Sequence, residues 1–196
     1  MHFNPNKTYH IYNQGNNKQQ IFFTHENYMY FLSMYKTLVA PHADTLAYCL
    51  MPNHFHFLIS TNETSVTPVK VGSLTLSALS NGIRVLLSSY ASAINKQQQT
   101  SGSLFRQKTK AKLLENGSAN YTFTAFHYIH QNPLEAGLVQ SLNDWEYSSF
   151  KDYTGIRKGT LCNKQLAKQL IDANWNDLTN ETYAFYKNKQ ELNGIF

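Results

Sequence analysis

Charged side chains are scarce in this chain of 196 residues. Asp, Glu, Lys and Arg make up 15% of it, against about a quarter in typical soluble domains. The chain has 17 Lys and Arg against 12 Asp and Glu, which gives a net charge of +5. An excess of this sign favours a polyanionic partner such as nucleic acid over a basic one.

Cysteine and long apolar runs are also missing. The two cysteines, Cys49 and Cys162, are too few for a disulfide framework and too far apart for a zinc pattern. No apolar stretch approaches the ~20 residues that span a bilayer, and the first residues lack the basic and apolar segments of a secretory signal. We therefore expect a cytoplasmic protein with no membrane partner. With 42% hydrophobic residues, the chain is rich enough in apolar side chains to bury a core.

Apolar periodicity predicts an α+β order of elements. The expected strands are 8–13, 46–50 and 54–59, with an irregular strand pair in 101–115 and a turn at Asn116-Gly117. The expected helices are 24–39, 71–96, 120–131 and 134–139, with one or two short helices after 163. This order favours a largely antiparallel sheet with helices packed on it, the class that includes split βαβ, ferredoxin-like folds.

Two histidines stand two residues apart in the third expected strand. Because side chains of a strand alternate between faces, His54 and His56 project to the same side, while Phe55 and Phe57 point to the other. Two imidazoles on one stiff element could hold a divalent cation. The alternative is a pair of surface or hydrogen-bonded histidines on an edge strand.

A second polar cluster follows some seventy residues later. Tyr128 and Asn132 are separated by four positions, so they share one face if the helix continues that far. Asn132 offers an amide oxygen as a third ligand for Mg²⁺ or Mn²⁺, and Tyr128 offers a phenol that can act as a covalent nucleophile. The residue before a proline disfavours helical geometry, which places Asn132 at the helix end. His127 and His130 lie on other faces and are weaker candidates.

Two segments are candidates for nucleic-acid binding. Alternating cations follow position 105, and on a strand they would face one way and could track a phosphate backbone. The alternative is a solvated strand face. A polar loop after the first strand could recognise bases through amide groups, or could simply form a turn. The candidate DNA-binding residues are Asn16, Asn17, Lys18, Arg106, Lys108, Lys110 and Lys112.

Four blocks of the sequence, taken in order, resemble the single-tyrosine HUH transposases of the IS200/IS605 type, and in particular their REP-associated branch. The run Asn13 to Phe22 resembles the N-terminal motif of that branch, and Tyr48 to Leu58 resembles the metal-binding strand. The run Tyr128 to Val139 resembles the nucleophile helix, and Trp145 to Phe150 resembles the segment after it. The sequence after Phe105 departs from the family pattern, and nothing beyond about Thr160 aligns with it.

The resemblance implies an RRM-like HUH core over residues 1–160, followed by a C-terminal helical extension, 161–196, of unknown role. His54, His56 and Asn132 would hold Mg²⁺ or Mn²⁺, and Tyr128 would be the nucleophile. The implied activity is metal-dependent cleavage and strand transfer of single-stranded or hairpin DNA through a 5′-phosphotyrosine. Family members act as monomers, or as homodimers that exchange the tyrosine helix. Both histidines must be neutral to bind metal, so we expect activity to fall below a pH of about 6.

Two other functions remain open from the sequence. The first is a domesticated DNA hairpin-binding protein with little or no catalysis. The second is a hydrolytic metalloenzyme acting on small substrates, which the sequence disfavours because no carboxylate base stands near the histidine pair.

Overall fold

The computed structural model describes residues 1–114 and 121–187. Its central element is a four-stranded sheet built from β1 (Thr8–Gln14), β2 (Asp44–Met51), β3 (His54–Ser60) and β6 (Lys110–Leu113). The strands lie in the order β2-β3-β1-β6, and every neighbouring pair is antiparallel. One helical connection joins β1 to β2 and another joins β3 to β6, as in a ferredoxin-like fold. The predicted fold class is confirmed.

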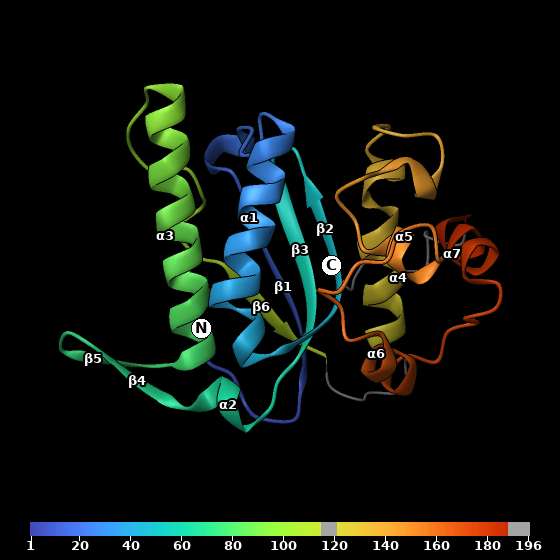
Figure 1. The fold of residues 1–196 in the computed structure, drawn as a ribbon, viewed down its shortest axis with the longest axis horizontal. Helices are drawn as coiled ribbons and strands as arrows, with labels where there is room; N and C mark the ends of the chain where they lie inside the picture. The colour runs from blue at the N-terminus through green and yellow to red at the C-terminus, as the bar shows by residue number, and fades with distance from the viewer. Residues whose placement is uncertain (115–120, 188–196) are drawn as a thin grey trace.

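Helices cover both faces of this sheet (Figure 1). On one face lie α1 (His25–Leu38) and α3 (Ala78–Gln98), and on the other lie α4 (Tyr121–Glu135), α5 (Phe150–Tyr153), α6 (Lys164–Leu170) and α7 (Leu178–Lys187). Short elements complete the described chain. They are α2 (Glu63–Val66) and the 3₁₀ turns Asn16–Lys18, Ala40–His42 and Leu142–Asp144.

Alternation along β3 divides the core in two. Phe55 and Phe57 are buried in the cluster beneath α1 and α3. Leu58 is buried in the second cluster, which α4 and α6 cover. Because both faces are buried, the register of β3 is strongly specified, since a one-residue slip would exchange the two side-chain sets. The histidines of β3 therefore lie on the α4 face.

The predicted helix over 71–96 is wrong in its first part. Residues before Ala78 form a hairpin of β4 (Pro68–Val71) and β5 (Leu74–Ser77). Gly72 has φ +60°, which a tight turn requires and few other residues tolerate. Ser77 then caps α3 by accepting a hydrogen bond from the backbone N–H of Ser80. The apolar residues of this hairpin have a spacing that also fits the apolar face of a helix.

Two further expectations differ from the structure. Within the described part of 101–115, β6 is the only strand, so the predicted strand pair is wrong. The predicted turn at Asn116-Gly117 lies outside the described residues. The expected break before Pro133 is also wrong, because α4 continues through this proline to Glu135.

The described C-terminal segment packs against the sheet and α4. The backbone N–H of Asn163 donates to the Thr45 carbonyl at 2.8 Å, which attaches the start of α6 to β2. The Gln131 side chain on α4 donates to the Thr182 carbonyl on α7. Both cysteines are buried free thiols. Among the described helices, none is both long and apolar enough to cross a membrane.

Candidate active site

The histidine pair lies on the sheet face that α4 covers. The rings of His54 and His56 have centroids 5.0 Å apart and are nearly perpendicular. His54 Nδ1 lies 2.6 Å from Asn53 Oδ1, in the turn that joins β2 to β3. The strand therefore presents both imidazoles on one side, as their spacing predicts.

Tyr128 comes from α4 and lies against this pair. Its ring centroid is 5.6 Å from that of His56, and the two rings meet edge to face. The Asn132 side chain lies near both Tyr128 and His54 and shifts the pKa of each toward its charged form. The structure thus brings together the four residues that the sequence singled out, from elements about seventy residues apart.

Asn132 is held by the backbone of its own helix. Pro133 has no N–H, so the Ile129 carbonyl loses its usual partner four residues later. The Asn132 Nδ2 atom lies 3.5 Å from that carbonyl and donates to the Tyr128 carbonyl at 2.8 Å. These contacts fix the side-chain amide on the helix surface and let α4 pass through the proline.

A third histidine joins the site from β1. His10 Nε2 lies 2.8 Å from His56 Nδ1, and the two rings stack with centroids 5.0 Å apart. Sequence reasoning placed His10 in a strand but gave it no role. Its proximity follows from the antiparallel pairing of β1 with β3, which places Tyr12 directly opposite His56. No local sequence signal indicates that pairing.

A cavity of about 230 Å³ opens beside these side chains. Tyr12, His54, His56 and Tyr128 line it together with three cations, Arg106, Lys108 and Lys110. Lys112, the fourth of the alternating cations, does not line the cavity. It pairs with His10 and lies on the same face of β6 as Lys110. Only Lys110 and Lys112 belong to a strand, so the prediction that all four alternate along one strand is wrong.

The loop 16–18 lies next to the turn that carries Asn53. The Gly15 N–H donates to the Asn53 carbonyl, and the Asn53 side chain donates to the Lys18 carbonyl. Asn16, Asn17 and Lys18 are exposed, and the last two have positive φ. Their side chains are therefore accessible to a partner, and a role in binding stays a prediction.

Burial dominates the electrostatics of the site. Burial lowers the pKa of His54, and Asn132 raises it by a smaller amount. Burial lowers the pKa of His56 well below the usual value. It also lowers the pKa of His10 to about 3. All three imidazoles are therefore neutral at neutral pH. Burial raises the pKa of Tyr128, and the hydrogen bond with Asn132 acts in the opposite direction.

The donor atoms suit a divalent cation. His56 Nε2 is buried and has no hydrogen-bond partner among the described residues, which is unusual for a buried polar atom. No group of three or more His, Cys, Asp or Glu in the described chain is placed to hold a metal. The amide oxygen of Asn132 is the candidate third ligand beside His54 and His56, and a site for Mg²⁺ or Mn²⁺ stays a prediction.

The two histidines of α4, His127 and His130, do not line the cavity. His127 Nδ1 is 2.8 Å from Thr182 Oγ1 on α7, and His130 Nε2 is 2.8 Å from Ser149 Oγ. Both histidines are buried. They fix α4 against its neighbours, as their different faces on the helix predict.

Comparison with solved structures identifies a related fold. A structure described as a REP-associated tyrosine transposase bound to a REP hairpin matches 79% of this chain and 83% of its own, with a TM-score of 0.57. The two chains share a fold. Their identity is 15%, so the similarity concerns the fold and not the function. No model of a protein family matches the chain, and no curated protein does.

Proposed function

We propose that this chain is a metal-dependent, single-tyrosine transposase or nickase acting on single-stranded DNA with hairpin features. The observation that supports the proposal most strongly is the position of Tyr128, whose ring meets that of His56 edge to face with centroids 5.6 Å apart and lies one helical turn before Asn132. The phenol of Tyr128 and the histidine pair line one cavity together with three cations, Arg106, Lys108 and Lys110. The fold shared with a transposase bound to a DNA hairpin supports the choice of substrate.

Strand cleavage would begin with Tyr128. Its phenolic oxygen attacks the scissile phosphorus in line, the bond to the 3′ oxygen breaks, and the products are a 5′-phosphotyrosine and a 3′-hydroxyl. Attack by another 3′-hydroxyl on the phosphotyrosine releases the phenol and joins the strands. The phosphoester bond is exchanged and not hydrolysed, so the transfer needs no nucleotide cofactor.

The other residues would prepare this attack. Arg106, Lys108 and Lys110 hold the phosphate backbone over the cavity. The hydrogen bond from Asn132 favours the phenolate of Tyr128, whose burial otherwise disfavours it. A divalent cation bound by His54, His56 and Asn132 would supply Lewis-acid stabilisation of the negative charge that develops in the transition state.

The test is formation of a covalent protein–DNA adduct. Labelled hairpin DNA with single-stranded flanks is incubated with the protein and Mg²⁺ or Mn²⁺, and the adduct is resolved on a denaturing gel. We expect an adduct with the natural chain, none with Tyr128→Phe, and an unchanged amount with Tyr30→Phe, an exposed tyrosine on α1. A chelator should abolish the adduct.

Tyr12 provides a sharper comparison, because its ring lines the same cavity. An adduct that persists in Tyr128→Phe but disappears in Tyr12→Phe would overturn the assignment of the nucleophile. Hairpin binding without an adduct at any metal concentration would overturn catalysis and leave a hairpin-binding protein.

A further inference from the structure

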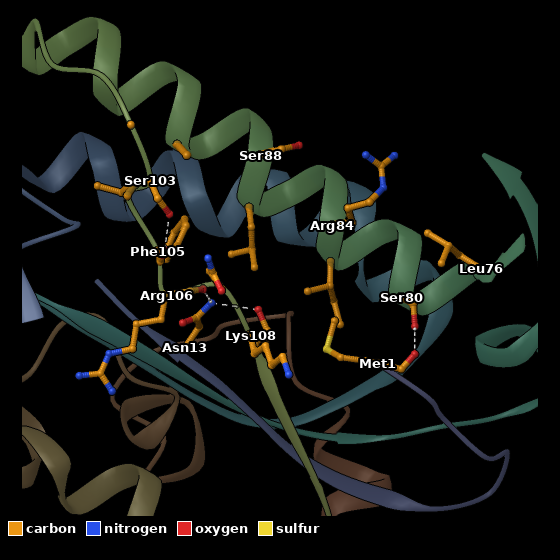
Figure 2. Close-up of a pocket in the computed structure, with 17 residues that line it drawn as sticks. Met1, Asn13, Leu76, Ser80, Arg84, Ser88, Ser103, Phe105, Arg106 and Lys108 are labelled. Carbon is orange, nitrogen blue, oxygen red and sulfur yellow. Dashed lines mark hydrogen bonds between the residues drawn. The ribbon is translucent and has the colours of Figure 1, made fainter. Parts of the chain in front are cut away.

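A second, larger cavity lies behind the candidate active site. It has a volume of about 720 Å³ and is bounded by α3 and the segment 102–109 (Figure 2). Figure 2 shows Met1 and Ser80 at one end of it and Ser103 and Phe105 at the other. The Ser80 hydroxyl donates to the Met1 carbonyl at 2.9 Å, which fixes the start of the chain at the first end. The proposed chemistry at Tyr128 takes place outside this cavity, although Arg106 and Lys108 line both.

The lining combines cations with an apolar wall. Arg84, Arg106 and Lys108 are among the lining residues, and no Asp or Glu is, but the Arg84 guanidinium points away from the cavity and donates to Asn81 Oδ1. Ile83, Leu87 and Ala91 come from one face of α3 and supply the apolar side. A ligand that matches both features has a flat apolar ring and a negatively charged group, as a nucleotide does.

The two cavities share one wall. Asn13, Arg106 and Lys108 line both of them. The Asn13 amide donates to the Arg106 carbonyl and to Thr109 Oγ1, and the Arg106 N–H donates to the Gln14 carbonyl. These bonds fix the segment to the end of β1, so it forms a ridge between the cavities. In Figure 2 the Arg106 guanidinium points away from α3.

We propose that the second cavity binds the base of one unpaired nucleotide of the DNA strand whose scissile phosphate lies at Tyr128. The strand crosses the ridge at Arg106 and Lys108, which contact its phosphates, and the base enters the cavity that Leu87 and Ala91 line. This inference rests on the proposed function and adds a site that reads the flank of the hairpin. Stacking on apolar and aromatic groups is tolerant of base identity, so the polar groups at the rim would set any preference.

The first test fills the cavity. Ala91→Trp places an indole in it, and Ser92→Trp is the matched control, because Ser92 is exposed on the same helix and does not line the cavity. Affinity is measured by fluorescence anisotropy for a hairpin with a single-stranded flank and for the same hairpin without it. We expect Ala91→Trp to weaken binding of the flanked hairpin about tenfold, with no change for the blunt hairpin. Ser92→Trp should match the natural chain with both.

The second test leaves the fold untouched. In the natural chain, 2-aminopurine replaces each flank base in turn, and one position should change its fluorescence on binding. An excess of free dAMP should not reverse that change, because the strand holds the base in place. A fluorescence change of the same size in Ala91→Trp would place the responding base outside the cavity, which overturns the proposal.

The charge at the rim gives a third comparison. Lys108→Gln should weaken binding of the flanked hairpin several-fold, whereas Lys96→Gln, an exposed cation of α3, should not. If no flank position responds and Ala91→Trp binds the flanked hairpin like the natural chain, the proposal is wrong even where the Tyr128 adduct forms. If no hairpin binds and no adduct forms, the proposed function itself fails.

Discussion

His10 Nε2 lies 2.8 Å from His56 Nδ1, and neither imidazole carries a positive charge at neutral pH because burial lowers the pKa of both. A neutral His56 that donates its Nδ1 proton to His10 keeps the lone pair on Nε2, the form that binds a metal. The arrangement makes His10 a positioning residue for the proposed cation site. It fixes the ring orientation of His56, and with His56 as the donor it also supports the tautomer that binds a metal.

Replacing His10 should therefore weaken metal binding. We expect His10→Phe to lower the affinity for Mn²⁺ about 10- to 100-fold, measured by titration calorimetry without DNA. His10→Gln, whose amide oxygen can still accept a proton from His56, should lose less. His2→Phe, an exposed histidine, is the control. A folded His10→Phe protein with the affinity of the natural chain would remove His10 from the site.

Substitutions of Asn132 distinguish a metal ligand from an amide that has only a structural role. Asn132→Ala removes the proposed oxygen ligand and the amide that lowers the pKa of Tyr128, so both Mn²⁺ affinity and adduct formation should fall by about two orders of magnitude. Asn132→Asp restores an oxygen ligand and should recover most of the metal affinity. The same measurements on Asn180→Ala, at an exposed position of α7, provide the baseline. Equal metal affinity in Asn132→Ala and Asn132→Asp would contradict a ligand role.

The cations beside the cavity should determine the salt dependence of DNA binding. A phosphate contact at Lys110 contributes about 0.7 to the slope of log affinity against log salt concentration for single-stranded DNA. We expect Lys110→Gln to reduce the slope by that amount and Lys36→Gln, an exposed cation of α1, to leave it unchanged. The slope is obtained by measuring DNA affinity over a series of salt concentrations. An identical slope in both variants would exclude Lys110 from the interface.

Much of the site follows from local patterns, and the rest depends on long-range pairing. Alternation in β3 predicts that His54 and His56 share a face, and helical spacing predicts the same for Tyr128 and Asn132. Nothing local in β1 distinguishes His10 from other buried strand residues. Its contact with His56 exists only because β1 lies beside β3.

The errors in the predicted elements also have physical causes. The hairpin before α3 contains Leu74 and Leu76 at positions that extend the apolar stripe of the helix, although Leu74 is 63% exposed. At Pro133 the rule that proline ends a helix fails, because the Asn132 amide lies near the carbonyl that the proline leaves unpaired. In both places, contacts between neighbouring side chains and backbone groups outweighed the local preference.

Stability should fall in acid, and the buried histidines determine the range. Burial lowers the pKa of His10 and of His130 to about 3, against 6.5 for a free imidazole. Between those values the unfolded chain binds protons that the folded chain does not, so stability is lost as pH falls from 6.5 toward 3. Each such histidine costs up to about 1.4 kcal/mol per pH unit. Because burial also lowers the pKa of His54 and His56, the loss of metal binding expected below a pH of about 6 should shift to lower pH.

Urea unfolding at pH 7.5, 6.0 and 5.0 measures this loss directly. His130→Asn removes one of the titrating groups, so its unfolding free energy should fall less steeply with acid than that of the natural chain, whatever its stability at pH 7.5. His2→Gln changes an exposed histidine and should leave the slope as it is. Equal unfolding free energies at pH 7.5 and 5.0 in the natural chain would mean that these imidazoles gain protons without unfolding, which their burial argues against.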